Sequence, residues 1–276
     1  LGGQVHKKLR SYTYLYPKKT DKVDVYTNAE LAAERANEYI EKGFNAVKFD
    51  PVGAYTPLDP RQLSLEDLIK VENFVEIIHK SVKNKCDLLI GTHGQMTTAS
   101  AIRLAKRLEK FDPMWFEEPV PPENFEEMGR VAQSTTIPIA TGERLTTKYE
   151  FSKVLQSQGA SILQMNLGRV GGMLEAKKIS GLAETHYAQI APHLYCGPIV
   201  GAANIQISTC SPNFLILEGI KDWKNFYSEI LKDPIIFENG YVIPPNKPGL
   251  GVELNEKVAC KNIYTGNKLH LEMAEV

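Results

Sequence analysis

The sequence predicts an α/β fold, a (β/α)8 barrel of the TIM type followed by a C-terminal extension. Eight short, almost continuously apolar runs alternate with stretches in which apolar residues recur every three or four positions. Strands that are apolar on both faces are typical of a parallel sheet covered by helices. The 276 residues are enough for one such barrel. A doubly wound sheet is the structural alternative, but no GxGxxG follows the first strand-like run.

The expected strands are short runs rich in β-branched, aromatic and aliphatic residues. They cover residues 11–16, 44–49, 87–91, 113–117, 137–142, 161–166, 188–193 and 213–219. The first expected helix follows Asn28, which suits an N-cap, and ends at Gly43. The second opens with the capping-box pattern of Ser64 followed by Glu66 and Asp67. Helices are expected over 28–43, 64–82, 96–111, 124–134, 146–159 and 171–186, and a mildly apolar stretch covers 197–210.

The chain divides into two predicted parts. Residues 1–220 form the barrel, and residues 221–276 form the C-terminal extension. Within the extension, residues 237–256 are punctuated by Pro and Gly in a way that favours a hairpin. We expect the extension to pack on the barrel or on a partner.

Composition excludes several classes of partner. The net charge is −1 with mixed signs, so no basic surface favours nucleic acid or an anionic membrane. No apolar run approaches the about 20 residues of a membrane span, and the first residues lack the apolar core of a secretory signal. The cysteines are widely spaced without a CxxC, which favours reduced thiols in a cytoplasmic protein. They are Cys86, Cys196, Cys210 and Cys260.

Two glutamates 26 residues apart, Glu117 in WFEEP and Glu143 in TGERL, each end a strand-like run. The carboxyl ends of parallel barrel strands meet at one mouth, where such folds keep their chemistry. Two carboxylates from adjacent strands suit Mg²⁺, which keeps waters and accepts a few carboxylates. The residue 26 positions before Glu117 is Gly91, so the end of the preceding strand supplies no carboxylate.

Other polar residues end the remaining strands. Lys48 and Asp50, at positions i and i+2, point to one side and reach the mouth or form a structural ion pair. His93 lies in a polar turn between glycines, and Asn166 ends the sixth run. His193 ends the seventh run and is the best candidate for acid/base work, because the unperturbed pKa of histidine is near neutral.

Three further charged residues follow strand ends. Glu118 neighbours Glu117, and paired carboxylates repel unless a metal or a cation compensates them. Glu118 either belongs to such a site or makes an ordinary salt bridge. Arg144 is placed to neutralise a carboxylate of the protein or of a substrate. Glu218 ends the eighth run.

With these residues together, the chain resembles the mandelate racemase branch of the enolase superfamily, and most closely its galactonate dehydratase-like sugar-acid dehydratases. The segments that carry the resemblance, over about residues 1–255, are WFEEPV, IPIATGER, SILQMNLGRVGGMLEAKKI, IAPHLYCGP and LILEG. The family comprises (β/α)8 barrels that bind Mg²⁺ and remove a proton α to a carboxylate, and the metal stabilises the enediolate. The resemblance implies that Glu117 and Glu143 are metal ligands, that His193 is the acid/base and that Glu218 lies beside the substrate. Such barrels often form homo-oligomers.

The chain departs from the family at several positions. The strand-3 carboxylate ligand aligns with Gly91, so His93 moves into the metal sphere, a water replaces the ligand, or metal binding is weak. The family's KxK motif appears as Lys48-Phe49-Asp50. Lys48 matches the lysine that contacts the substrate carboxylate, whereas Asp50 replaces the lysine base of the racemases and argues against two-base racemisation.

Two more departures concern the acid/base and the chain ends. Asn166 aligns with the Asp that orients the catalytic histidine, so we expect His193 to be a weaker base than in the relatives. His93 matches a histidine that serves the leaving group in galactonate dehydratases. We expect the family's N-terminal α+β capping domain, whose loops close over the site, to be missing from this chain, which would then be a truncated form.

The favoured interpretation is a Mg²⁺-dependent acid-sugar dehydratase, a hydro-lyase acting on an aldonate or aldarate. The expected residues are His193, His93, Lys48 and Asn166 as catalytic, Glu218, Arg144 and Asp50 as substrate-binding, and Glu117 and Glu143 as metal ligands. The alternatives are a cycloisomerase or epimerase of the same branch, a Schiff-base aldolase with Lys48 as nucleophile, and an impaired barrel that acts as a binding module. Selectivity would depend on the cap and on Tyr55, His93, Arg144 and Tyr195.

Overall fold

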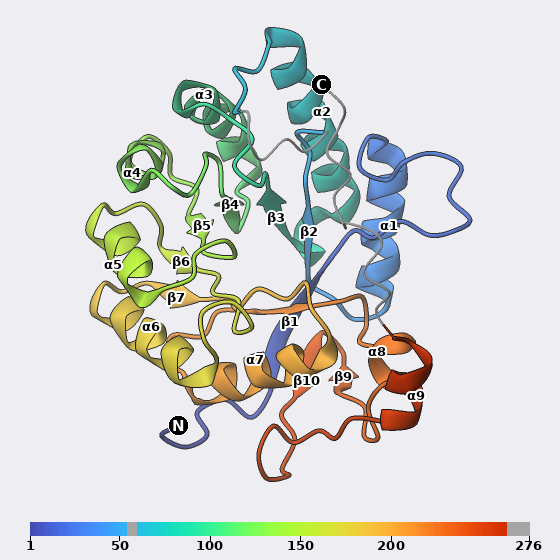
Figure 1. Cartoon of the computed structure of the whole chain (residues 1–276). Coiled ribbons are helices and arrows are strands. Elements are labelled where there is room, and N and C mark those ends of the chain that lie inside the picture. Colours follow the sequence, from blue (N-terminus) through green and yellow to red (C-terminus); the bar gives the residue numbers. More distant parts are fainter. Residues whose placement is uncertain (54–59, 264–276) are drawn as a thin grey trace.

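The structure, a computed structural model, describes residues 1–53 and 60–263, and in these residues parallel strands are ringed by helices (Figure 1). The barrel strands are β1 (Leu9–Tyr14), β2 (Ala46–Phe49), β3 (Asp87–Gly91), β4 (Trp115–Glu117), β5 (Ile139–Thr141), β6 (Ile162–Leu163), β7 (Gln189–Ile190) and β8 (Leu217–Gly219). Each of the eight expected runs contains or overlaps one of them. Tyr55 and residues 264–276 of the predicted extension lie outside the described residues.

The strands close into a barrel. Neighbours from β1 to β7 pair in parallel in sequence order, and β8 pairs with β1. The chain just before β8 bridges to β7, where Ile190 N donates to Asn213 O and Leu215 N donates to Ile190 O, each at 2.9 Å. The prediction of a (β/α)8 barrel is therefore confirmed, and the doubly wound alternative is wrong.

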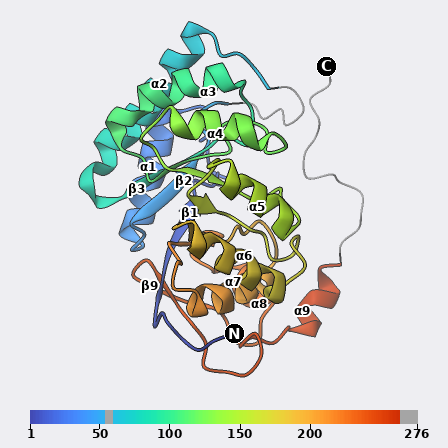
Figure 2. The same ribbon diagram turned by 90° about the vertical axis from the view of Figure 1, so that its left-hand side faces the viewer.

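Helices cover the outside of the strands (Figures 1 and 2). Asn28 accepts a hydrogen bond from Leu31 N, and Ser64 and Asp67 form a reciprocal capping box, so both predicted helix starts are confirmed. The expected helix over 96–111 ends at Leu108 and continues as a 3-10 turn, Glu109–Phe111. The helices are α1 (Ala29–Glu41), α2 (Leu65–Val82), α3 (Thr98–Leu108), α4 (Phe125–Gln133), α5 (Lys148–Gln156), α6 (Met173–Thr185), α7 (Pro198–Cys210), α8 (Phe226–Glu229) and α9 (Glu256–Lys261). In the described part of the chain no helix is long and apolar enough to span a membrane.

The core has two parts. A large apolar cluster joins the strands to the helices, and a small one fills the barrel interior. The interior cluster comprises Tyr12, Ala46, Leu89, Trp115, Ala140, Ile162, Ala191 and Ile216. The rings of Tyr12 and Trp115 meet edge to face with centroids 5.3 Å apart. This layer closes the barrel below its carboxyl-end mouth, and side chains two positions further along each strand point to the same interior.

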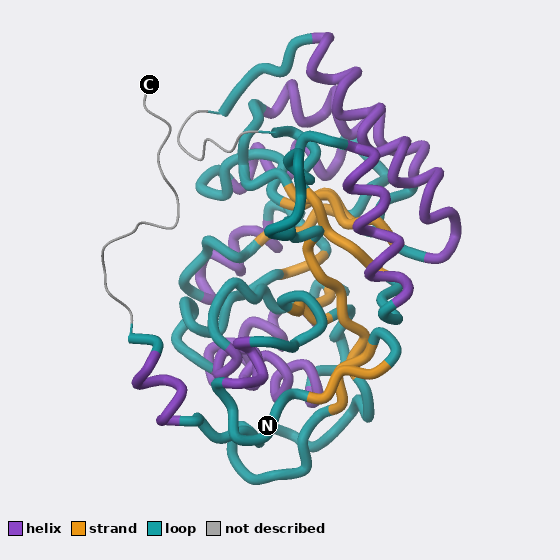
Figure 3. Tube along the Cα trace, turned by 90° about the vertical axis from the view of Figure 1, so that its right-hand side faces the viewer, coloured by secondary structure: helices purple, strands orange, loops and turns teal. Residues whose placement is uncertain are grey.

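A hairpin extends the sheet at the amino end of β1, away from the carboxyl-end mouth. Strands β9 (Ile236–Glu238) and β10 (Tyr241–Ile243) pair antiparallel, and β10 pairs with the start of β1 (Figure 3). Gly240 in the turn has a φ of 85°, and a Cβ there would lie 2.4 Å from the carbonyl oxygen of Gly43. The predicted hairpin is confirmed, and it packs on the barrel.

Candidate active site

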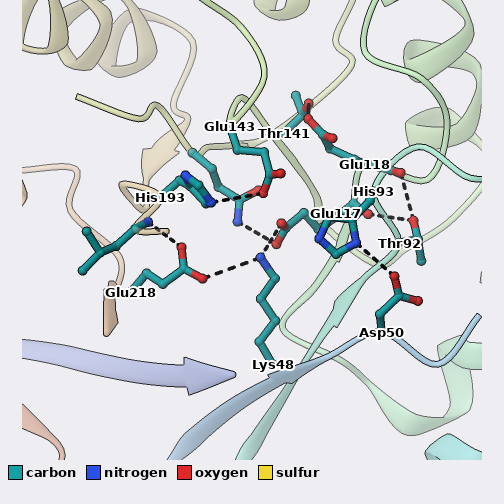
Figure 4. Close-up of polar contacts among 12 residues, drawn as sticks. Lys48, Asp50, Thr92, His93, Glu117, Glu118, Thr141, Glu143, His193 and Glu218 are labelled. Atoms are coloured by element: carbon teal, nitrogen blue, oxygen red, sulfur yellow. Dashed lines mark hydrogen bonds and ion pairs between the residues drawn. The ribbon is translucent and has the colours of Figure 1, made fainter. Parts of the chain in front are cut away.

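The carboxyl-end mouth of the barrel collects the residues that lie two positions beyond the interior layer (Figure 4). They are Tyr14, Lys48, Gly91, Glu117, Gly142, Gln164, His193 and Glu218. The loops that follow the strands add Asp50, His93, Glu118, Glu143, Arg144 and Asn166. The structure therefore brings the sequence-predicted residues among these to one mouth, where hydrogen bonds and ion pairs link them into three groups.

Lys48 is the centre of the first group and is only 2% exposed. Its Nζ donates to Oε1 of Glu117 at 2.5 Å and lies 3.8 Å from Oε1 of Glu218. Burial disfavours the ammonium, but the charges of Glu117, Glu218 and Glu143 outweigh burial and raise the pKa of Lys48. A class I aldolase needs a lysine with a depressed pKa, so this environment disfavours the Schiff-base alternative.

Glu117 uses both carboxylate oxygens in hydrogen bonds, whereas Glu218 uses one and faces Lys48 with the other. Oε2 of Glu117 accepts from Nε2 of Gln164 at 2.7 Å, and Oε2 of Glu218 accepts from Leu194 N at 2.7 Å. Burial raises the pKa of Glu117 to about 7, with Lys48 opposing the rise. These bonds fix both carboxylates against the walls of the mouth.

His193, Asn166 and Glu143 form the second group. Nδ2 of Asn166 lies 2.9 Å from Nδ1 of His193, and Nε2 of His193 lies 3.6 Å from Oε2 of Glu143. Burial disfavours the charged Glu143, but His193 and Lys48 outweigh burial and lower its pKa to about 2. Glu143 is therefore ionised beside His193 at neutral pH.

The orientation of the Asn166 amide fixes the tautomer of His193. Oδ1 of Asn166 accepts from Gly168 N at 2.9 Å, and Nδ2 also donates to Sγ of Cys196 at 3.5 Å. The amide NH₂ therefore faces Nδ1 of His193, which must accept. In the neutral ring the proton then lies on Nε2, on the side of Glu143, so this arrangement presents His193 as a proton donor.

His93 and Asp50 begin the third group. Nδ1 of His93 lies 3.0 Å from Oδ2 of Asp50, which also accepts from Nε2 of Gln95 at 3.1 Å. Burial would lower the pKa of His93, but the bond to Asp50 and the charge of Glu143 raise it to about 9. His93 is thus an imidazolium at neutral pH, and Asp50 holds its ring.

Glu118 makes the buried salt bridge that was one of its two interpretations. Nε of Arg144 donates to Oε2 of Glu118 at 2.8 Å, and Arg144 also donates to the carbonyl oxygen of His93 at 3.0 Å. Burial raises the pKa of Glu118, with Arg144 opposing the rise. The ion pair between Arg144 and Glu118 thus stabilises the turn that contains His93. The backbone of His93 has a φ of 50°.

The donor set does not fit the expected Mg²⁺ site. Among residues 1–53 and 60–263, no three His, Cys, Asp or Glu side chains form a group that could hold a metal. Both carboxylate oxygens of Glu117 accept hydrogen bonds from protein donors. Gly91 has no side chain and so supplies no metal ligand. A Cβ at Gly91 would lie 3.1 Å from Cε of Lys48, so the lysine stem fills the space beside the vacant strand-3 position.

Sequence reasoning missed Gln164, which positions Glu117. Gln164 lies two residues before Asn166 on the same strand run, so the strand periodicity used for Lys48 and Asp50 would have found it. Thr141, two residues before Glu143, was also missed, and its Oγ1 donates to Oε1 of Glu118 at 3.2 Å.

Comparisons with known proteins show which proteins the chain is similar to. The family described as "Enolase C-terminal domain-like" matches residues 31–258. D-xylonate dehydratase of Haloferax volcanii is 33% identical over 98% of this chain and 65% of its own length. D-gluconate/D-galactonate dehydratase of Picrophilus torridus is 33% identical over 96% of this chain and 66% of its own length. The chain thus spans about two thirds of the length of these relatives.

Solved structures share the fold closely. One from Labrenzia alexandrii, assigned to the mandelate racemase/muconate lactonizing enzymes, is 61% identical with a TM-score of 0.95 over 99% of this chain and 70% of that chain. One from Burkholderia SAR-1, with the same assignment, is 60% identical with a TM-score of 0.96 over 100% of this chain and 68% of that chain.

Proposed function

The chain belongs to the enolase C-terminal domain-like family, in the mandelate racemase branch of the enolase superfamily, and on that premise we propose that it acts as an acid-sugar dehydratase. The substrate class is an aldonate or aldarate, and the reaction removes water from the carbons α and β to the carboxylate. The names of the relatives from Haloferax volcanii and Picrophilus torridus support this class.

The observation that carries the proposal is the presence of two histidines, His193 and His93, on either side of the amine of the buried Lys48 (Figure 4). Dehydration breaks the α C–H bond and the β C–O bond, so one group must take a proton and another must give one. Lys48 lies between the histidines, where positive charge would stabilise the negative charge that develops on the substrate carboxylate. The enol left after loss of water becomes a 2-oxo acid.

His93 is the proposed acid. Asp50 engages its Nδ1, and the raised pKa keeps the ring protonated at neutral pH, so Nε2 retains a proton for the departing β-hydroxyl. His193 is the proposed partner at the α carbon. To take the α proton it needs a free Nε2, which requires the Asn166 amide to turn so that Oδ1 accepts from Nδ1–H. That turn breaks the bond between Gly168 N and Oδ1.

Members of the enolase superfamily generally use Mg²⁺. The donor set of this mouth does not fit that ion, so the proposed steps use only the residues of the chain. Glu218, which accepts from Leu194 N, and Arg144, which is held by Glu118, are proposed to shape the mouth around the substrate.

Turnover of an acid-sugar panel tests the proposal. The chain is incubated with D-xylonate, D-gluconate, D-galactonate and the corresponding aldarates, and any 2-oxo acid is trapped with semicarbazide. His93→Asn and His193→Asn should each lower the rate by about 10²–10⁴-fold, the usual contribution of a general acid or base. His186→Asn, an exposed histidine after α6, is the matched control and should leave the rate unchanged. If no acid sugar gives a 2-oxo acid, the proposal is wrong.

A further inference from the structure

We propose that the ammonium of Lys48 takes the place of the divalent metal at this mouth, so that the site receives its acid substrate without a metal ion. The proposal concerns the same site as the proposed dehydratase, but it rests on packing and donor geometry. Metal binding can therefore be measured whether or not turnover is found.

The first argument is space. The strand-3 position at the mouth is Gly91, and two of the three atoms nearest to an added Cβ there belong to the side chain of Lys48, Cε at 3.1 Å and Cγ at 3.9 Å. An Asp on β3 would meet the lysine stem, and Lys48 would have to shift by a few tenths of an ångström to admit its Cβ. A third ligand at this position and the present pose of Lys48 therefore compete for space.

The second argument is the use of the carboxylate oxygens. Glu117 is bonded through Oε1 to Lys48 and through Oε2 to Gln164, at 2.5 and 2.7 Å. Glu218 faces Lys48 with Oε1 and accepts from Leu194 N with Oε2. A divalent cation at Glu117 would have to displace an ammonium from a fully buried carboxylate and would then lie beside that displaced positive charge.

The third argument is charge balance. The glutamates around Lys48 are Glu117, Glu143 and Glu218, and Glu118 lies beside Arg144. The mouth therefore already has positive groups against most of its carboxylates, because Lys48 lies within 3.8 Å of Glu117 and Glu218 and Arg144 pairs with Glu118. An added divalent ion would not be needed to make this cluster of carboxylates stable.

The test is a titration with Mn²⁺ followed by the electron paramagnetic resonance signal of the free ion. The unmodified chain should show no site with a Kd tighter than about 1 mM, which corresponds to a binding free energy of only about −4 kcal/mol. The double variant Gly91→Asp, Lys48→Met adds the third carboxylate and removes the ammonium. It should bind one Mn²⁺ at least about tenfold more tightly, since even partners of metal ligands are worth about 10–100-fold in affinity.

Three controls make the result decisive. Gly181→Asp adds a carboxylate on α6 at a position where a Cβ meets nothing within 4 Å, and it should leave Mn²⁺ binding unchanged. Circular dichroism checks that the double variant is folded. If it is not folded, the titration of the unmodified chain alone decides whether the mouth binds Mn²⁺. The proposal is overturned if the unmodified chain binds one Mn²⁺ tightly and Glu143→Gln abolishes that binding. It is also overturned if the folded double variant binds no better than the unmodified chain.

Discussion

Replacing Lys48 by methionine should destabilise the fold strongly. Methionine keeps the apolar stem but removes the charge, so Glu117 and Glu218, which are 1% and 4% exposed, lose their common cation. Breaking a buried ion pair by removing one partner costs about 3–5 kcal/mol. At about 2–4 °C per kcal/mol for a chain of this size, the melting temperature should fall by roughly 10 °C.

The loss should depend on pH. The pKa of Glu117 is raised to about 7 by burial, even though Lys48 opposes the rise, and removing Lys48 raises it further. A carboxyl whose folded pKa is raised contributes stability that is full below its unfolded pKa and is lost as pH rises through the folded pKa. The melting temperature of Lys48→Met should therefore fall further below that of the unmodified chain at about pH 8 than at about pH 5.

The assay is thermal unfolding followed by circular dichroism at both pH values. Lys80→Met is the matched control, because the side chain of Lys80 is 71% exposed and pairs with Glu76 at the surface, so its effect should stay within about 0.5 kcal/mol. The double variant Lys48→Met, Glu117→Gln should recover much of the loss, because it removes the unpaired charge. If Lys48→Met melts at the same temperature as Lys80→Met, the buried ion cluster does not stabilise the mouth.

Two further predictions concern the histidines. His93, with a pKa raised from 6.5 to about 9, contributes stability that is full below about pH 6.5 and is lost as pH rises through about 9. Asp50→Asn should flatten this part of the stability profile, and an unchanged slope in pH-dependent melting would contradict the assignment. Asn166→Asp supplies an acceptor to Nδ1 of His193 and should move the proton of the neutral ring from Nε2 to Nδ1, as seen in ¹H–¹⁵N spectra of the imidazole. Finding the Nδ1–H tautomer in the unmodified chain would refute the account of Asn166.

The strands of the barrel could be predicted because each is short, apolar and followed by a helix with a clear cap. Even β6 and β7, which are only two residues long, were found because apolar runs surround them. Strand-like bonding continues beyond β7, where His193 N donates to Met165 O at 3.2 Å. This bonding brings Asn166 and His193 to the mouth, as expected from their places at the ends of the runs.

The partners of the site residues could not be predicted in the same way. An ion pair between Lys48 and Asp50 was one of their two interpretations, whereas Lys48 pairs with Glu117 and Asp50 holds His93. Glu117 is 69 residues from Lys48, and the contact depends on how side chains from different strands pack across the barrel. Periodicity tells which residues face the mouth, but it does not tell which of them meet.

A crystal structure of the chain grown with an aldonate and Mn²⁺, with anomalous scattering data collected for manganese, tests the central claim most directly. We predict that the aldonate carboxylate lies beside Lys48, with His93 and His193 on either side of the substrate and without an anomalous peak at the mouth. An anomalous peak between Glu117 and Glu143, with Lys48 turned away, would contradict the account.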